Sequence, residues 1–252
     1  MIEISNVSKS YRGKTVLHPL NLTLKPGGII SIVGANGAGK STLLSLLSRL
    51  ESPDNGQILI DGHDVQLTPS DVLATRVSIL RQDNHLVSRL RVRDLVAFGR
   101  YPYCKGRLTA HDAAKIDEAL HFLDLHELQD RFLDELSGGQ RQRAYVAMVI
   151  CQDTDYILLD EPLNNLDMQH SVAMMQLIRR LADELKRTIL LVIHDINFAA
   201  AYSDTIVALK NGHLIRHDTP ASMMHPATLE QIFNTPVRVI EQANHPLAVY
   251  YR

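Results

Sequence analysis

Residues Gly34 to Thr42 carry the clearest chemistry in this chain of 252 residues. They fit the phosphate-loop pattern G-x-x-x-x-G-K-[ST], and apolar runs that suit a strand and a helix flank them. Glycines let such a loop point its backbone N–H groups inward, and the helix N-terminus adds further donors for an anion. A glycine-rich turn that binds nothing is the weaker alternative, because both flanks suit the motif. We expect nucleotide contacts from Gly34, Asn36, Gly37, Ala38, Gly39, Lys40, Ser41 and Thr42.

The side chains of this loop suggest how a nucleoside triphosphate would be held. Lys40 would place a cation on the β- and γ-phosphates, and the Ser41 hydroxyl can ligate Mg²⁺. ATP and Mg²⁺ are therefore the expected substrate and cofactor.

Two carboxylates follow a second buried run. Residues 156–159 are continuously apolar, which is typical of a strand buried on both faces, and Asp160 and Glu161 come next. Ligands of open α/β sheets bind at the carboxyl ends of the strands. Asp160 could therefore bind the nucleotide's Mg²⁺, and Glu161 could polarise the water that attacks the γ-phosphorus. A pair of solvated acids is less convincing in a chain that also has a phosphate loop.

Two further polar residues follow predicted strands at this edge of the sheet. His194 follows the run 188–193 and could contact the γ-phosphate or the attacking water. Gln82 follows the run 77–80 and can offer its amide oxygen to Mg²⁺ or to water. Each is a weak signal alone, since an isolated histidine is more often structural. With Glu161 they form the predicted catalytic group, and Ser41, Gln82 and Asp160 form the predicted Mg²⁺ set.

The sequence Leu136-Ser137-Gly138-Gly139-Gln140 precedes a predicted helix over 141–150. Ser137 is a good N-cap, and the glycines allow close approach of another group. One interpretation is an ordinary capped helix. The other is a second anion site, built from the Ser137 hydroxyl, the Gly139 N–H and the helix dipole.

The elements that must position these residues change in character along the chain. Residues 2–33 alternate as strands do, and helical spacing dominates from about 85 to 152, where Thr109 can cap a helix. Strand-like runs return at 156, and a helix follows in which Met174 and Met175 suit core packing. The tail from about 226 suggests one short helix and a strand or two.

Composition narrows the class of protein. The chain is 45% hydrophobic and 21% charged, which suits a globular core, and its net charge of -2 gives poor support for a nucleic-acid partner. Cys104 and Cys151 fit neither a metal nor a disulfide spacing. The chain opens on a predicted strand, so we expect no secretory signal. No apolar run approaches the roughly 20 residues that a membrane span needs.

The order of these motifs resembles that of the ATPase subunit of an ATP-binding-cassette (ABC) transporter, from end to end. Six motifs follow that family's order: phosphate loop 34–42, Q-loop Gln82, signature 136–140, Walker B 156–160 with Glu161, D-loop 164–167 and switch His194. The signature is the most specific motif, because other phosphate-loop enzymes lack it.

This resemblance implies an α/β fold: a phosphate-loop NTPase core with a mostly parallel sheet, an N-terminal antiparallel β subdomain and an inserted α-helical subdomain. Residues 1–84 and 153–252 would form the core with the β subdomain, and 85–152 the helical subdomain within one ABC ATPase domain.

The resemblance also implies a head-to-tail homodimer that sandwiches two ATP molecules. Each would lie between the phosphate loop of one subunit and the signature of the other, so Ser137, Gly138, Gly139 and Gln140 would act in trans. Asp167 belongs to the D-loop. Tyr11 matches the family's adenine-stacking aromatic, with an exposed connector tyrosine as the alternative. Two departures are visible: Ala35 replaces the commoner proline, and Asn164-Asn165 is an unusual start to a D-loop.

Two stretches narrow the subfamily. Residues 93–103 resemble a stretch of importers of iron-siderophore complexes, haem and vitamin B12, and residues 163–171 resemble ATPases of catechol-type siderophore uptake, of the vibriobactin or petrobactin kind. The resemblance implies ATP-driven uptake of an iron(III)-siderophore complex. Haem, vitamin B12 or another metal chelate are the alternative cargoes.

The implied partners are two transmembrane permease subunits, docked near Asn84 to Tyr103, and through them a substrate-binding protein. The implied location is peripheral, on the cytoplasmic face of the bacterial cytoplasmic membrane. A soluble ABC ATPase acting on DNA or ribosomes is less favoured, because such relatives carry long coiled coils or two cassettes. A nucleotide-gated switch with little turnover is disfavoured by Glu161 and His194.

Overall fold

The computed structural model describes residues 1–82, 89–242 and 245–251. Its strands are β1 (Ile2–Tyr11), β2 (Lys14–Leu24), β3 (Gly28–Val33), β4 (Asn55–Ile60), β5 (His63–Asp64), β6 (Val77–Leu80), β7 (Tyr156–Asp160), β8 (Thr188–Val192), β9 (Thr205–Lys210), β10 (His213–Asp218), β11 (Arg238–Gln242) and β12 (His245–Val249). Its α-helices are α1 (Lys40–Leu47), α2 (Ser70–Ala74), α3 (Val92–Ala97), α4 (Tyr101–Cys104), α5 (Ala110–Phe122), α6 (Gly138–Cys151), α7 (Met168–Glu184), α8 (Ile196–Tyr202), α9 (Pro220–Met223) and α10 (Pro226–Phe233).

A six-stranded sheet in the order β10-β9-β3-β8-β7-β6 forms the centre of the molecule. All neighbouring strands are parallel except β10, which pairs antiparallel with β9 at one edge. Every residue of β7 and β8 is buried, as their continuous apolar runs predict. Asp160 pairs in register with Val192, so the carboxyl ends of β7 and β8 lie together, just before Glu161 and His194.

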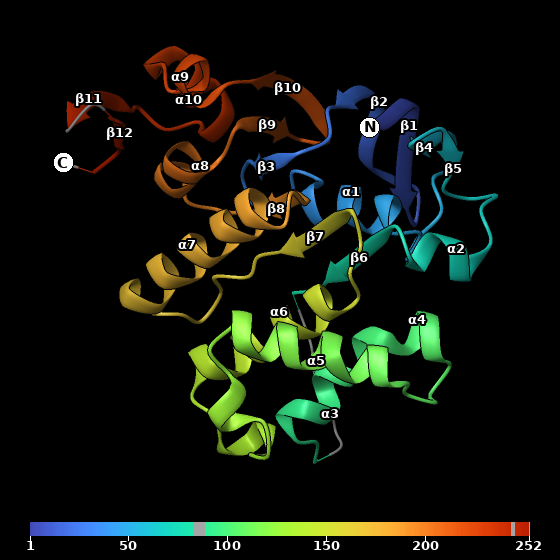
Figure 1. The fold of residues 1–252 in the computed structure, drawn as a ribbon. Helices are drawn as coiled ribbons and strands as arrows, with labels where there is room; N and C mark the ends of the chain where they lie inside the picture. Colours follow the sequence, from blue (N-terminus) through green and yellow to red (C-terminus); the bar gives the residue numbers. More distant parts are fainter. Residues whose placement is uncertain (83–88, 243–244, 252) are drawn as a thin grey trace.

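A second, antiparallel sheet in the order β2-β1-β4-β5 covers the other side of α1, which lies between the two sheets (Figure 1). These two sheets confirm the predicted fold class. Strand β1 extends to Tyr11, so the turn before β2 consists only of Arg12 and Gly13. Both residues have positive φ, as a tight hairpin turn requires.

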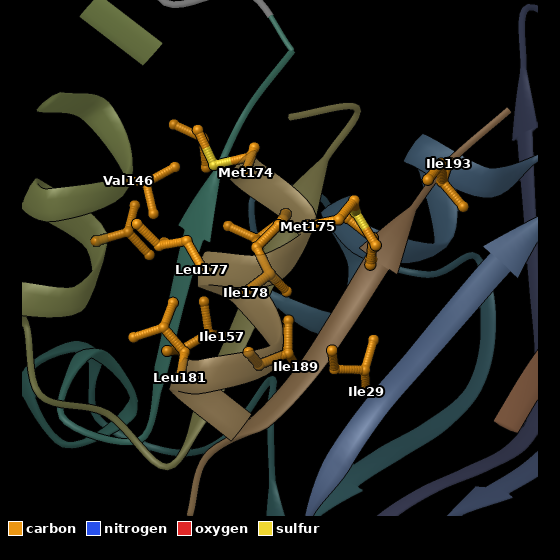
Figure 2. Close-up of a cluster of buried hydrophobic side chains, with 14 of the residues drawn as sticks. Ile29, Val146, Ile157, Met174, Met175, Leu177, Ile178, Leu181, Ile189 and Ile193 are labelled. Carbon is orange, nitrogen blue, oxygen red and sulfur yellow. The ribbon is translucent and has the colours of Figure 1, made fainter. Parts of the chain in front are cut away.

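The helices α3, α5 and α6 pack together beside the central sheet (Figure 1). Figure 2 shows how one buried cluster joins Val146 of α6 to Met174 and Leu177 of α7 and to Ile157 of β7. Met174 and Met175 are both buried there, so the prediction that they serve core packing is confirmed. The predicted Thr109 cap is also confirmed, because its side chain accepts a hydrogen bond from the Asp112 N–H.

The tail contains helix α10 and the hairpin β11–β12, as its pattern predicts. Asn197 of α8 holds this hairpin: its amide donates to the Ala248 carbonyl at 3.2 Å and accepts from the Ala248 N–H at 2.7 Å. Within the described part of the chain, none of the helices has the length and apolar character needed to cross a membrane.

Candidate active site

The loop between β3 and α1 needs glycine at two positions. Gly34 has φ +146°, and a Cβ there would lie 2.1 Å from the carbonyl oxygen of Leu209. Gly39 caps α1 in the left-handed conformation, with φ +97°. These two glycines let the chain turn from the sheet directly into the first helix, whose N-terminus opens on the loop.

Lys40 points its ammonium group back into the loop. Its Nζ donates to the carbonyl oxygens of Gly34 at 2.9 Å and Ala35 at 3.1 Å, and the residue is only 5% exposed. Burial lowers the pKa of Lys40, while the negative charges of Glu161 and Asp160 act to raise it. A buried cation whose partners are mostly neutral carbonyls is well suited to an incoming phosphate.

Ser41 and Asp160 form an oxygen pair beneath the loop. The Ser41 hydroxyl donates to Oδ1 of Asp160 at 2.9 Å, and Asp160 is 8% exposed. Burial raises the pKa of Asp160, which the Ser41 hydrogen bond and the charge of Lys40 partly offset. Hydroxyl and carboxylate oxygens are ligands that Mg²⁺ accepts, and ligands at 2.0–2.1 Å from an octahedral ion lie roughly 2.9 Å apart. These two residues could therefore contribute to a magnesium site.

Glu161 is held by three side chains from different motifs. Its Oε1 lies 2.7 Å from Nε2 of His194. Its Oε2 accepts hydrogen bonds from Nε2 of Gln82 at 2.8 Å and from Nδ2 of Asn164 at 2.6 Å. The carboxylate side chain is 9% exposed and the His194 side chain 43% exposed. The structure thus brings all three predicted catalytic residues together, with Glu161 at the centre.

A cleft of about 340 Å³ lies over this group. Its lining consists of Val16, Asn36, Gly37, Ala38, Gly39, Lys40, Ser41, Thr42, Gln82, Glu161 and His194. Most of the residues that the sequence assigns to nucleotide binding therefore share one cleft. Gly34 and Asp160 contact it from behind, through Lys40 and Ser41.

Tyr11 lies at the end of β1, beside the helix that follows the phosphate loop. The residue is 39% exposed, and its hydroxyl donates to Glu51. Burial, together with Glu51, raises the pKa of Tyr11 to about 12, against a smaller opposing effect of Thr42. An exposed ring next to Thr42 is available to stack on a flat group, and its role in adenine binding stays a prediction.

The signature forms the start of α6, away from the nucleotide cleft. Ser137 is the N-cap: its hydroxyl accepts from the Gln140 N–H, and the Gln140 side chain accepts from the Ser137 N–H at 3.0 Å. This capping box starts the helix at Gly138, so the predicted start at residue 141 was wrong by three residues. Among the described residues that line the cleft, none comes from the signature.

The signature packs against the start of α7 in its own chain. A Cβ on Gly139 would lie 2.5 Å from the ring of His170, so a larger residue would have to displace that ring. Asp167 caps α7, and its Oδ1 lies 2.7 Å from Nδ1 of His170. Hydrogen bonds from the His170 backbone and side chain lower the pKa of Asp167. The D-loop thus connects the Glu161 turn to the signature.

Sequence reasoning missed two residues of this site. Val16 lines the cleft because β2 runs past Gly39, a contact that no motif marks. Asn164 contacts Glu161, and the only signal for it was the unusual D-loop that it begins.

The chain is similar to known proteins over most or all of its length. The family model described as ABC transporter matches residues 17–164. The petrobactin import ATP-binding protein YclP of Bacillus subtilis is 52% identical over 251 residues, which cover 100% of each chain. A solved ABC transporter of the metal-chelate type, in an inward-facing conformation, has a TM-score of 0.87 at 25% identity and covers 100% of this chain and 97% of that one. A dimeric ATP-binding cassette, MJ0796 with bound ADP and phosphate, has a TM-score of 0.77 at 28% identity, over 87% and 99%.

Proposed function

Because the chain belongs to the ABC transporter family, we propose that it is the ATP-hydrolysing subunit of an importer of iron(III)-siderophore complexes. The observation that carries this proposal is the full-length similarity to a petrobactin import ATP-binding protein. The structural likeness to a metal-chelate transporter supports the same class of cargo. Petrobactin is therefore the first siderophore to test.

Hydrolysis is assigned to the residues around the cleft. Lys40 and the N–H groups of the loop hold the phosphates and neutralise their charge, in the same cleft that Glu161 lines. Glu161 accepts the proton of the attacking water through one carboxylate oxygen. His194 and Gln82 hold that carboxylate in the cleft while the phosphorus–oxygen bond to the leaving ADP breaks.

The proposed magnesium site is formed by Ser41, Asp160 and Gln82. The first two provide oxygen atoms 2.9 Å apart. Gln82 donates from its amide nitrogen to Glu161 and lines the cleft, and its amide oxygen is the atom that we assign to Mg²⁺. When bound, Mg²⁺ offsets the negative charge that builds on the β- and γ-phosphate oxygens.

The proposed assembly is a head-to-tail homodimer that closes over two ATP molecules. The cassette MJ0796, a structural neighbour, is a dimer. The Ser137 hydroxyl, the glycine backbone at 138–139 and Gln140 would complete the partner's site, with Asp167 beside that interface. ATP would then hold the interface shut, and hydrolysis would release it.

The proposed permease contact lies on the segment near α3 and α4. Phe98 and Tyr101 are 49% and 60% exposed there, which suits an apolar partner helix. Residues 84–88 of the predicted docking region lie outside the described residues. We assign residues 85–152 to a helical subdomain that moves with the permease, and place the complex at the cytoplasmic face of the membrane.

Growth on one iron source tests the function. A strain whose chromosomal copy carries Glu161→Gln should fail to grow with iron(III)-petrobactin as its sole iron source, because uptake needs hydrolysis. Growth with excess free iron salt should be normal. The control Glu241→Gln removes the same charge from an exposed position on β11 and should grow on both. Normal growth of the Glu161→Gln strain on every iron(III)-siderophore would refute the proposed function.

A further inference from the structure

The unusual asparagine at the start of the D-loop is bonded to the proposed catalytic base. Nδ2 of Asn164 donates to Oε2 of Glu161 at 2.6 Å. The backbone N–H of Asn164 also donates to the Glu161 carbonyl at 3.1 Å, which closes a tight turn between the two residues. The Glu161 backbone has φ +51° in this turn, a conformation that residues with a Cβ rarely adopt.

Asn164 reaches Glu161 from outside the nucleotide cleft. Gln82 and His194 line the cleft together with Glu161, whereas Asn164 is not among its described lining residues. The contact is also the most local of the three, because both partners belong to one turn of four residues. Asn164 therefore has the means to fix the carboxylate without touching ATP.

We propose that Asn164 is a positioning residue that aims the Glu161 carboxylate at the attacking water. The proposal rests on the hydrolytic role proposed for Glu161. With Asn164 in place, Oε2 is shared by two amide donors and Oε1 faces His194, so rotation of the carboxylate is restricted. Without it, Gln82 is the one donor to Oε2 that remains among the described residues.

Steady-state ATP hydrolysis by the full-length chain tests this role with matched variants. Asn164→Ala should lower kcat about tenfold or more, the loss expected for a hydrogen bond to a charged group, and leave KM for ATP unchanged. Asn164→Asp keeps the shape but places a second carboxylate against Glu161. Two like charges at that distance repel, so the Glu161 carboxylate should be displaced and kcat should fall at least as far as in Asn164→Ala, with KM for ATP again unchanged.

Two references keep the outcomes separate. Asn234→Asp adds the same charge at the end of α10, where Lys210 already faces Asn234, and should keep the wild-type kcat and KM. Glu161→Gln should abolish most hydrolysis, and if it does not, the proposed role of Glu161 and the positioning role both fall. If Glu161→Gln is inactive but both Asn164 variants keep the wild-type kcat, only the positioning role is refuted. A rise in KM with kcat unchanged would refute it equally.

Discussion

Asp160 and Lys40 are both held in surroundings that oppose their charge. Asp160 is buried beneath the phosphate loop, and burial raises its pKa above the ordinary value of 3.8. Burial likewise lowers the pKa of Lys40. Residues whose charged form is destabilised by burial are common at sites where a charged ligand binds. The charges of the residues that we assign to phosphate and magnesium binding therefore lower the free energy of unfolding.

This cost predicts that Asp160→Asn stabilises the nucleotide-free chain. The asparagine oxygen can still accept the Ser41 hydrogen bond, but it carries no charge. Because the folded pKa is raised, ionised Asp160 destabilises the fold as pH rises from about 4 through that raised value, and the full cost is present at pH 7.5. We expect the Tm of Asp160→Asn to exceed wild type by about 2–4 °C at pH 7.5.

Thermal unfolding followed across pH would check this sign. The difference in Tm between Asp160→Asn and wild type should disappear below the ordinary carboxyl pKa, because the side chain of residue 160 is then neutral in both proteins. Hydrolysis by Asp160→Asn should be lost at every pH. A variant no more stable than wild type at pH 7.5 would contradict the argument.

At the scale of elements, the stretch 93–103 joins three helices. Nε of Arg100 donates to Oδ1 of Asp112 at 2.9 Å, and Nη1 donates to the Cys151 carbonyl at 2.9 Å. The guanidinium lies 4.0 Å from the centre of the Tyr103 ring. These contacts fix the start of α5 to the end of α6. The stretch 93–103, which resembles siderophore importers, thus also has a structural role, since its Arg100 links α5 to α6.

The Arg100–Asp112 ion pair predicts that the stability of the helical region falls at acidic pH. Hydrogen bonds from the Thr109 N–H and hydroxyl, and then the Arg100 contact, hold the pKa of Asp112 at about 2. Asp112 therefore stabilises the fold above its ordinary pKa of 3.8, and that contribution is lost as pH falls from 3.8 toward 2. Asp112→Asn should lower the Tm by roughly 5 °C at pH 7, because it leaves Arg100 buried without its charged partner.

Comparison with a second variant isolates this effect. Asp124→Asn removes a charge from an exposed position that already has positive φ, which asparagine tolerates. Its Tm should match wild type at every pH. The gap between Asp112→Asn and wild type should narrow as pH falls below 4, and a gap independent of pH would argue against the ion pair.

Sequence patterns predicted the elements better than the contacts between them. The buried runs of β7 and β8 and the methionines of α7 follow from periodicity alone, and the order of motifs follows from the chain. The start of α6 was not predicted correctly, because glycines disfavour a helix unless a capping box starts it. The Asn164–Glu161 contact and the Asn197–Ala248 contact depend on side chains that meet only in the folded chain.

At the scale of the whole molecule, one chain holds parts of two different ATP sites in our proposal. The phosphate loop and Glu161 share a cleft, whereas the signature caps α6 and packs through Gly139 on His170. This contact within the subunit places the signature beside the D-loop. The D-loop joins these two parts, since Asn164 contacts Glu161 and Asp167 contacts His170.

This arrangement predicts that two inactive variants restore each other. Ser137→Arg should block the site of the partner, and Glu161→Gln should block the site of its own chain. In a mixed head-to-tail dimer both defects fall in one site, and the other site is intact. With random pairing, an equal mixture should recover about a quarter of wild-type hydrolysis, because half of the dimers carry one good site of two.

Hydrolysis by the mixture, with mixed dimers counted by native mass spectrometry, would decide between trans and cis action of the signature. If the signature served its own chain, each subunit of the mixed dimer would remain defective and activity would stay at the level of the single variants. A mixture of Ser137→Arg with itself and an inert carrier protein gives that level. Mixed dimers without recovered hydrolysis would therefore overturn the shared site, whereas recovery requires that the Ser137 of one chain completes the cleft of the other.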